Sequence, residues 1–251
     1  MKLMISDASQ FIQHRKNTFS ITNKRIQQII SYVCECYGIC LKEKTKNPYS
    51  INAVKENSTL SFEDYLKFDL VDNYLNVKKH LLKDKISKLE DIHFAAETQE
   101  RYIDLVDSKQ KPDKIDIYVD RLGLQSEWMS KNNQVYFAIE CKRIRILSDT
   151  KAYIGDIRKV ANRNHTNLRL PFEGQIAFIE NLNIDHHKVM TKANSILKKD
   201  IEINTLQYLK FQSFHSFFQN TYSSVHTKNF GGKESFYVYH LLFDYSQIVM
   251  N

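Results

Sequence analysis

Three ionisable residues in two short apolar runs have side chains that could bind a metal ion together. Asp116 lies in the run 114–119, and Glu140 and Lys142 lie at the end of the run 136–142. Carboxylate oxygens are the ligands that Mg²⁺ prefers, and such an ion lowers the pKa of a bound water. A lysine beside them can orient that water or stabilise negative charge on a phosphate. The three residues therefore suit metal-assisted hydrolysis of a phosphodiester.

Both runs are predicted to be β-strands, because they are rich in β-branched and aromatic residues and are bounded by polar or turn-forming residues. Side chains alternate between the two faces of a strand. Glu140 and Lys142 therefore share one face of their strand, and Asp116 shares a face with Tyr118. Pairing of the two strands would bring Asp116, Glu140 and Lys142 together, while the opposite faces are apolar and suited to a core.

The triplet at the end of the second strand is a weak signal when taken alone. The pattern E-x-K occurs once, at Glu140, but D-x-K occurs at Asp107 and Asp149 as well. The alternative interpretation is two amphipathic strands with solvated charges on their outer faces. The elements around the two strands favour a shared metal site over two strands with solvated charges.

These elements follow a definite order along the chain. Apolar residues recur at helical spacing after Ser61, which can cap a first turn with Asp64. The polar stretch 99–111 is expected to be a loop. The predicted order is a helix, three strands, a helix and a strand, at residues 61–82, 92–97, 114–119, 136–142, from about 150, and 174–180.

Asp116 followed by Glu140-Cys141-Lys142, in this order of elements, resembles the PD-(D/E)xK nuclease superfamily, which has the restriction-endonuclease-like fold. Pro112-Asp113 also spells the letters PD, but Asp113 precedes the strand, so Asp116 is taken as the motif aspartate. The resemblance implies an α/β fold with an αβββαβ core, in which helices flank a central mixed sheet. It also implies Mg²⁺-dependent hydrolysis of DNA, with Mn²⁺ able to substitute, in bacterial defence or restriction.

The resemblance also implies the residues of the site. Asp116 and Glu140 would bind the metal, the carbonyl of Cys141 would supply a third oxygen, and Lys142 would assist the chemistry. In the superfamily the helix before the sheet often carries a further acidic residue, and Glu63 in the first turn of the helix 61–82 is the preferred candidate. Glu97, at the end of the strand 92–97, is its rival. A carboxylate that only stabilises the helix dipole is the other interpretation of Glu63.

A looser similarity concerns the C-terminal part of the chain. The runs 222–227 and 236–244 are predicted to form a hairpin. The pattern S-x-H at Ser224, followed by H-L-L-F-D at 240–244, is similar to small bacterial nuclease-like proteins of the same superfamily. The similarity covers residues 59–251 and leaves a predicted helical region, residues 1–58, outside it. His226 is expected to make a structural hydrogen bond, with a role as a phosphate ligand as the alternative.

The helix that begins near residue 150 carries basic side chains beside its apolar face. A basic helix directly after the strand with the E-x-K triplet can contact DNA phosphates. A solvated helix face is the equally weighted alternative. The basic residues proposed to bind substrate are Lys151, Arg158, Lys159 and Arg163.

Composition sets broad limits on the class of protein. The 251 residues are 42% hydrophobic and 26% charged, with 6 glycines and 3 prolines, which argues against disordered or collagen-like character. The net charge of +7 permits a polyanionic partner without requiring one. No apolar run approaches the ~20 residues of a membrane span, and the N-terminus becomes polar too early for a signal peptide. A cytoplasmic protein without a membrane partner is therefore expected.

The cysteines fit this expectation, because reduced thiols are usual in the cytoplasm. Cys34, Cys36 and Cys40 lack the C-x₂-C spacing of common structural zinc sites, so they are predicted to be small buried side chains.

Two classes of function remain open. The first is a Mg²⁺-dependent nuclease that acts on DNA, with RNA as a weaker alternative substrate. The second is a catalytically silent module that keeps the fold and binds nucleic acid or protein. A homodimer, or other subunits of a defence system, are further candidate partners.

Overall fold

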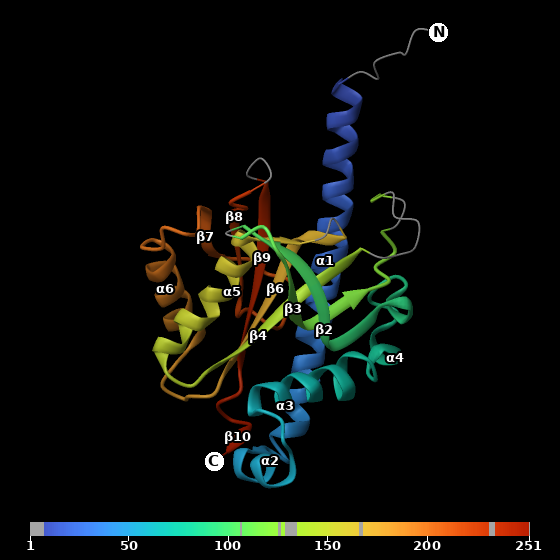
Figure 1. Cartoon of the computed structure of the whole chain (residues 1–251). Coiled ribbons are helices and arrows are strands. Elements are labelled where there is room, and N and C mark those ends of the chain that lie inside the picture. Colours follow the sequence, from blue (N-terminus) through green and yellow to red (C-terminus); the bar gives the residue numbers. More distant parts are fainter. Residues whose placement is uncertain are drawn as a thin grey trace, which may run out of the picture.

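The computed structural model describes residues 8–105, 107–124, 127–128, 135–165, 168–230 and 234–250. These residues form a mixed α/β fold in which a curled eight-stranded sheet has helices on both faces (Figure 1). The predicted α/β class and the flanked mixed sheet are thereby confirmed.

The helices and strands have the following bounds. The α-helices are α1 (Ala8–Lys44), α2 (Ile51–Asn57), α3 (Phe62–Asp69), α4 (Lys79–Leu82), α5 (Thr150–Asn162) and α6 (His186–Leu197). The strands are β1 (Tyr49–Ser50), β2 (His93–Asp104), β3 (Gln110–Asp120), β4 (Tyr136–Ile144), β5 (Arg163–His165), β6 (Arg169–Ile179), β7 (Thr205–Phe211), β8 (Thr221–Thr227), β9 (Ser235–Asp244) and β10 (Val249–Met250).

The large sheet has the strand order β5-β2-β3-β4-β6-β9-β8-β7. Strands β4, β6 and β9 run parallel, and the other neighbours are antiparallel, so the predicted hairpin of β8 and β9 is present. Strand β6 lies between two parallel neighbours and is buried along almost its whole length, which explains its apolar sequence. Separately, β1 and β10 form a short parallel pair.

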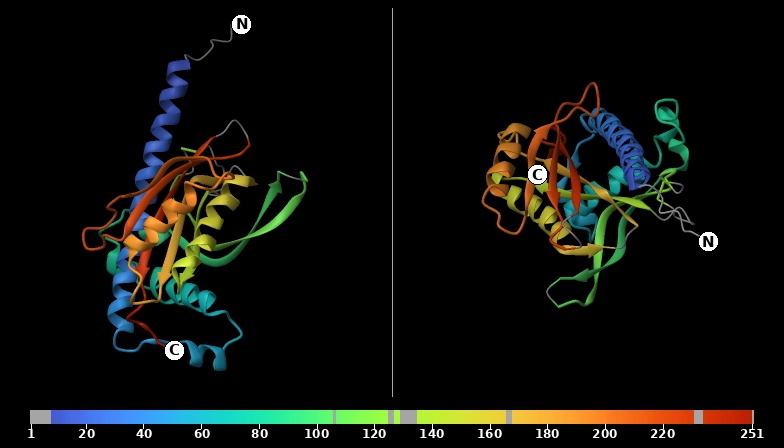
Figure 2. Two further views of the ribbon diagram at one scale, coloured as in Figure 1. Left: turned by 90° about the vertical axis from the view of Figure 1, so that its left-hand side faces the viewer. Right: turned by 90° about the horizontal axis from the view of Figure 1, so that it is seen from above.

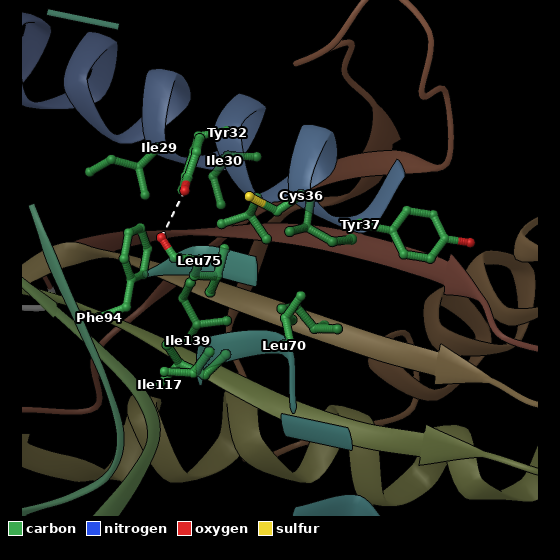
Figure 3. Packing of buried hydrophobic residues seen from close by; sticks show 14 of the residues in the cluster. Ile29, Ile30, Tyr32, Cys36, Tyr37, Leu70, Leu75, Phe94, Ile117 and Ile139 are labelled. Carbon is green, nitrogen blue, oxygen red and sulfur yellow. Dashed lines mark hydrogen bonds between the residues drawn. The ribbon is translucent and has the colours of Figure 1, made fainter. Parts of the chain in front are cut away.

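Helix α1 packs across one face of the sheet, and α5 and α6 pack on the other (Figure 2). The side chains Ile26, Ile29 and Ile30 of α1, at the helical spacing seen in the sequence, are fully buried. They belong to one cluster with Ile117 of β3 and Ile139 of β4 (Figure 3). The N-terminal helix therefore completes the core of the sheet on that side.

The cysteines of α1 are buried and free, as the sequence predicts. Cys36 donates weakly to the carbonyl of Tyr74, and Cys40 lies 3.2 Å from the hydroxyl of Tyr49. In the described part of the chain, no helix has both the length and the apolar character needed to cross a bilayer.

Two sequence predictions about local structure are wrong. The helix expected over residues 61–82 is interrupted, because α3 passes into a π-helical turn at Leu70–Leu75 before α4 begins. The stretch 99–111 is mostly strand, since β2 and β3 pair along their lengths as a long ribbon (Figure 2), and the outer end of β2 also pairs with β5. Mutual pairing satisfies the backbone of this ribbon, so polar side chains are tolerated there.

Candidate active site

The candidate site lies where β3 and β4 separate. The ladder between them ends at the pair of Ile117 with Ile139, so Asp116 and Glu140 lie just beyond its last pair. The main-chain N–H of Cys141 instead donates to Asp116 Oδ2, at 2.8 Å. The aspartate side chain thus takes the position of a ladder acceptor and is fixed against β4.

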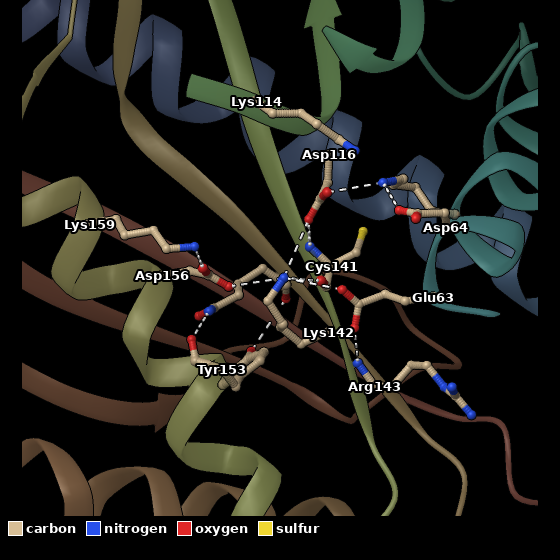
Figure 4. Close-up of polar contacts among 12 residues, drawn as sticks. Glu63, Asp64, Lys114, Asp116, Cys141, Lys142, Arg143, Tyr153, Asp156 and Lys159 are labelled. Carbon is tan, nitrogen blue, oxygen red and sulfur yellow. Dashed lines mark hydrogen bonds and ion pairs between the residues drawn. The ribbon is translucent and has the colours of Figure 1, made fainter. Parts of the chain in front are cut away.

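Helix α3 places Glu63 over the end of β4. Ser61 caps this helix, because its Oγ accepts from the main-chain N–H of Asp64 and donates to the carboxylate of the same residue. Glu63 in the first turn then accepts a hydrogen bond from the main-chain N–H of Arg143 (3.0 Å) and another from Lys142 Nζ (3.3 Å). Four predicted site residues, Asp116, Cys141, Lys142 and Glu63, therefore meet at one point (Figure 4).

The ammonium group of Lys142 lies among oxygens from four residues. It donates to the carbonyl of Cys141 at 2.9 Å and forms ion pairs with Asp156 at 3.5 Å and Asp116 at 3.8 Å, in addition to Glu63 (Figure 4). Burial lowers the pKa of Lys142, but the carboxylates of Asp156 and Asp116 outweigh burial and raise the pKa above its usual range. Lys142 is therefore a cation at physiological pH.

Glu140 lies on the α5 side of the sheet. Glu140 is among the residues that line a narrow cavity between α5 and β6, together with Asp156, Glu173 and Gln175. Burial, and then the negative charges of Asp116 and Asp156, raise the pKa of Glu140 well above its usual range. This carboxylate is thus short of positive charge, which is the condition in which a bound cation stabilises it most.

A second buried lysine, Lys67 of α3, occupies the other side of Asp116. Its side chain is only 1% exposed, and its ammonium group contacts Asp64 at 2.7 Å, Glu97 at 2.8 Å and Asp116 at 3.1 Å. Lys114 also pairs with Glu97. Asp116 is therefore held between two lysines, with Lys67 on Oδ1 and Lys142 nearer to Oδ2.

Glu63 and Glu97, the rival candidates for a further acidic ligand, lie on opposite sides of Asp116. Glu63 contacts Lys142 and the backbone of β4, whereas Glu97 contacts Lys67 and Lys114. Glu97 also has a left-handed backbone, with φ of 57°. Of the two, Glu63 is the one joined to the cluster around Lys142.

Two residues of this cluster were not singled out from the sequence, namely Lys67 and Asp156. Asp156 lies on α5 between Tyr153 and Val160, so it is a charge within the buried face of a helix. That misplacement in an apolar stripe is the signal that could have identified it. Lys67 follows the buried Leu66 directly and stands four residues after Glu63, a spacing that places both on one side of the helix.

The four basic residues proposed to bind substrate differ in their ion-pair partners. Lys151 is exposed, and Lys159 lies beside the site in an ion pair with Asp156 at 2.6 Å. Arg158 instead pairs with Asp200 of the segment after α6, and Arg163 pairs with Asp113, each at 2.5 Å.

The oxygen-rich donor set fits a hard divalent cation. It combines the carboxylates of Asp116, Glu140, Glu63 and Asp156 with the carbonyl of Cys141, and such oxygens suit Mg²⁺ or Mn²⁺. Asp156 Oδ2 is buried and accepts no hydrogen bond from the described residues, so one oxygen of the set has unused acceptor capacity.

A second cluster of possible ligands fits a cation less well. Glu100, Asp113 and His165 offer ligand atoms within 4.8 Å of one another. However, Glu100 is already paired with Arg169, and Asp113 with Arg163. The carboxylates of this cluster are neutralised by guanidinium groups, so it is better described as a structural ion-pair network.

His226 makes structural hydrogen bonds, as expected. Its ring is fully buried and lies 2.8 Å from Ser224 Oγ and 3.1 Å from Thr205 Oγ1. The same serine contacts His240, which in turn contacts the hydroxyl of Tyr153 on α5 at 2.8 Å. A buried polar chain thus runs from β7 to α5.

Comparisons with known proteins give no assignment. No model of a protein family matches the chain, and neither the curated proteins nor the solved structures provide a match.

Proposed function

We propose that the protein is a Mg²⁺-dependent nuclease of the PD-(D/E)xK superfamily that hydrolyses DNA. The observation that carries the proposal is the meeting of Asp116, Lys142 and Glu63 at one point, with Glu140 on the same side of the sheet. These residues come from three segments of the chain, around residues 63, 116 and 140–142, which are far apart in the sequence. Apart from the short elements α4 and β5, the order α3, β2, β3, β4, α5, β6 follows the αβββαβ arrangement, which supports a restriction-endonuclease-like core.

In this proposal Asp116, Glu140 and the carbonyl of Cys141 hold Mg²⁺ or Mn²⁺, and Glu63 and Asp156 lie within reach of the same position. When bound, the cation polarises the phosphate and lowers the pKa of a water. Glu63 and Asp156 have a further task, because both contact the ammonium of Lys142 and fix its position.

Lys142 acts on the substrate through its charge. Its ammonium carries donors for an attacking water and a positive charge for the phosphate oxygens, on which negative charge grows as the phosphorus–oxygen bond breaks. Exposed Lys151 and half-exposed Lys159 on α5 are basic groups available to DNA phosphates. A setting in bacterial defence or restriction belongs to the same proposal and comes from the sequence resemblance.

The test is cleavage of supercoiled, linear and single-stranded DNA with Mg²⁺, with Mn²⁺ and with EDTA. We expect cleavage only with a metal ion, and loss of cleavage in Asp116→Ala. Asp107→Ala is the matched control, because Asp107 also begins a D-x-K triplet but lies at the far end of the β2–β3 ribbon, where it pairs with Lys111. Full activity of Asp116→Ala, or equal cleavage in EDTA, would contradict the proposal. DNA binding without cleavage on any substrate would favour the silent binding module instead.

A further inference from the structure

Lys67 uses all of its hydrogen-bonding capacity inside the candidate site. An ammonium group has three N–H donors. Those of Lys67 go to Asp64 Oδ1, Glu97 Oε1 and Asp116 Oδ1. Its side chain is almost completely buried, so water does not compete for these contacts. Lys67 is therefore a fixed positive charge that joins three carboxylates.

The charges around the site favour the binding of a divalent cation. Six carboxylates, Glu63, Asp64, Glu97, Asp116, Glu140 and Asp156, lie around four ammonium groups, Lys67, Lys114, Lys142 and Lys159. With every group ionised, the formal charge is −2. The carboxylates therefore outnumber the ammonium groups, and a bound divalent cation would reduce this excess of negative charge.

Lys67 also occupies the place where a second ion would need to bind. Two-metal sites hold their ions about 3.5–4 Å apart, usually across a shared ligand. Asp116 is the carboxylate with access to both sides of this site, and Lys67 contacts its Oδ1 while Cys141 N–H contacts its Oδ2. The ammonium group therefore lies on the carboxylate oxygen that a second ion would share.

We infer that Lys67 is a built-in substitute for a second metal ion, so that the site binds one divalent cation, on the Glu140 side of Asp116. The inference rests on the proposed metal-dependent function and specifies it further. An ammonium group neutralises carboxylates as an ion does, but it cannot coordinate a water. Lys67 is thus a positioning residue, and any water that is activated by a cation belongs to the single ion beside Glu140.

The test counts bound Mn²⁺ ions, by isothermal calorimetry and by the electron spin resonance signal of free Mn²⁺. We expect one ion in the wild type and two in Lys67→Gln, which removes the charge but keeps an amide donor. Lys67→Arg should retain one ion. Lys114→Gln is the matched control, because Lys114 also pairs with Glu97 but is half exposed, and it should retain one ion as well.

The outcomes separate this inference from the function on which it rests. Two ions in the wild type would overturn the inference and leave a metal-dependent nuclease intact, whereas no ion in the wild type would overturn both. One ion in folded Lys67→Gln would show that Lys67 does not exclude a second cation. If that variant does not fold, Lys67→Gln/Asp64→Asn removes one charge of each sign and should also bind a second ion; a single ion in it would overturn the inference.

Discussion

Among individual residues, Lys142 has the position that most directly links structure to chemistry. Its ammonium is surrounded by Glu63, Asp116, Asp156 and the carbonyl of Cys141. None of these contacts requires Lys142 to be a metal ligand itself. Loss of its charge should therefore affect the reaction far more than the binding of a cation.

We predict that Lys142→Met lowers the DNA cleavage rate by roughly 10²–10³-fold, the usual effect of removing one group that stabilises transition-state charge. Mn²⁺ should still bind to this variant, because the oxygen ligands remain. Cleavage time courses and Mn²⁺ calorimetry on the same protein check both parts. Lys114→Met, which removes a half-exposed lysine near the site, should cleave DNA at close to the wild-type rate. Wild-type cleavage by Lys142→Met would exclude the assigned role.

The sequence anticipated the site residues that lie on strands better than those that lie on helices. Asp116, Glu140 and Lys142 could be placed because alternation along a strand fixes the face of every side chain. Lys67 and Asp156 could not be assigned, since their partners lie on other elements and depend on how α3 and α5 pack on the sheet. Periodicity describes the face of a helix but does not show which strand side chain will meet it.

At the scale of elements, the contact between β4 and β6 is unusually close at Gly174. A Cβ atom at this position would lie 2.7 Å from Ile139 Cγ1 and 3.0 Å from Phe137 Cζ, both in the buried core. Gly174 therefore permits the two parallel strands to approach beneath the side chains of β4.

We expect Gly174→Ala to lower the free energy of unfolding by about 1–3 kcal/mol, the range typical of an overpacked core. Gly38→Ala is the matched control, because nothing lies within 4 Å of a Cβ added at that helical position. The control should be neutral or should stabilise the protein by about 0.5–1 kcal/mol. Urea unfolding of the two variants measures the difference, and equal stabilities would contradict the packing described for β4 and β6.

The buried chain from β7 to α5 predicts a pH dependence of stability. Burial lowers the pKa of His226 from 6.5 to about 4, and it lowers the pKa of His240 as well. Between these two pH values the unfolded chain binds a proton at His226 and the folded chain does not, so acid favours unfolding. The contribution of neutral His226 to the free energy of unfolding is fully present above pH 6.5. It falls by about 3 kcal/mol as the pH decreases toward 4.

The measurement is the free energy of unfolding from urea titrations at several pH values across that window. His226→Gln, which stays neutral, should show a shallower loss of stability on acidification than the wild type. An unchanged slope in the variant would show that His226 does not contribute to the acid sensitivity.

Helix α3 and the β2–β3 ribbon show why some elements escaped prediction. Most of the apolar residues of 61–82 are buried as their spacing predicts. A π-helical turn at Leu70–Leu75, however, changes the number of residues per turn and interrupts the α-helix. The outer part of the ribbon lacks an apolar alternation in its sequence, because its less exposed face carries charged side chains such as Glu100 and Asp113, which are held in ion pairs. Its stability comes from pairing between distant residues, such as Arg101 with Pro112, which no local pattern records.

At the scale of the whole molecule, the net charge of +7 would favour the proposed binding of DNA, and the ion pairs of α5 indicate which of its basic residues are available for phosphate contacts. Lys151 is exposed and forms no ion pair with the described residues, whereas Arg158 is held by Asp200 and Glu202. A paired arginine is less available to a phosphate than a free lysine is.

Lys151→Gln should therefore weaken DNA binding and reduce the slope of log K against log salt by roughly 1, as expected for one lost phosphate contact. Arg158→Gln should leave that slope unchanged. Binding isotherms at several salt concentrations compare the two variants with the wild type. A larger change of slope for Arg158→Gln than for Lys151→Gln would contradict the assignment of the phosphate contact to Lys151.

The order in which the ribosome releases the strands has a consequence for folding, because of the position of β9 in the sheet. Strands β7 and β8 are synthesised before β9, yet they join the rest of the sheet only through it. A nascent chain that has emerged as far as β8 has the edge of β6 uncovered and a β7–β8 hairpin with an open edge of its own. Two open strand edges on one chain can pair with each other in the wrong register or with a neighbouring nascent chain. The interval before residues 235–244 leave the ribosome is thus when this fold is most exposed to misassembly.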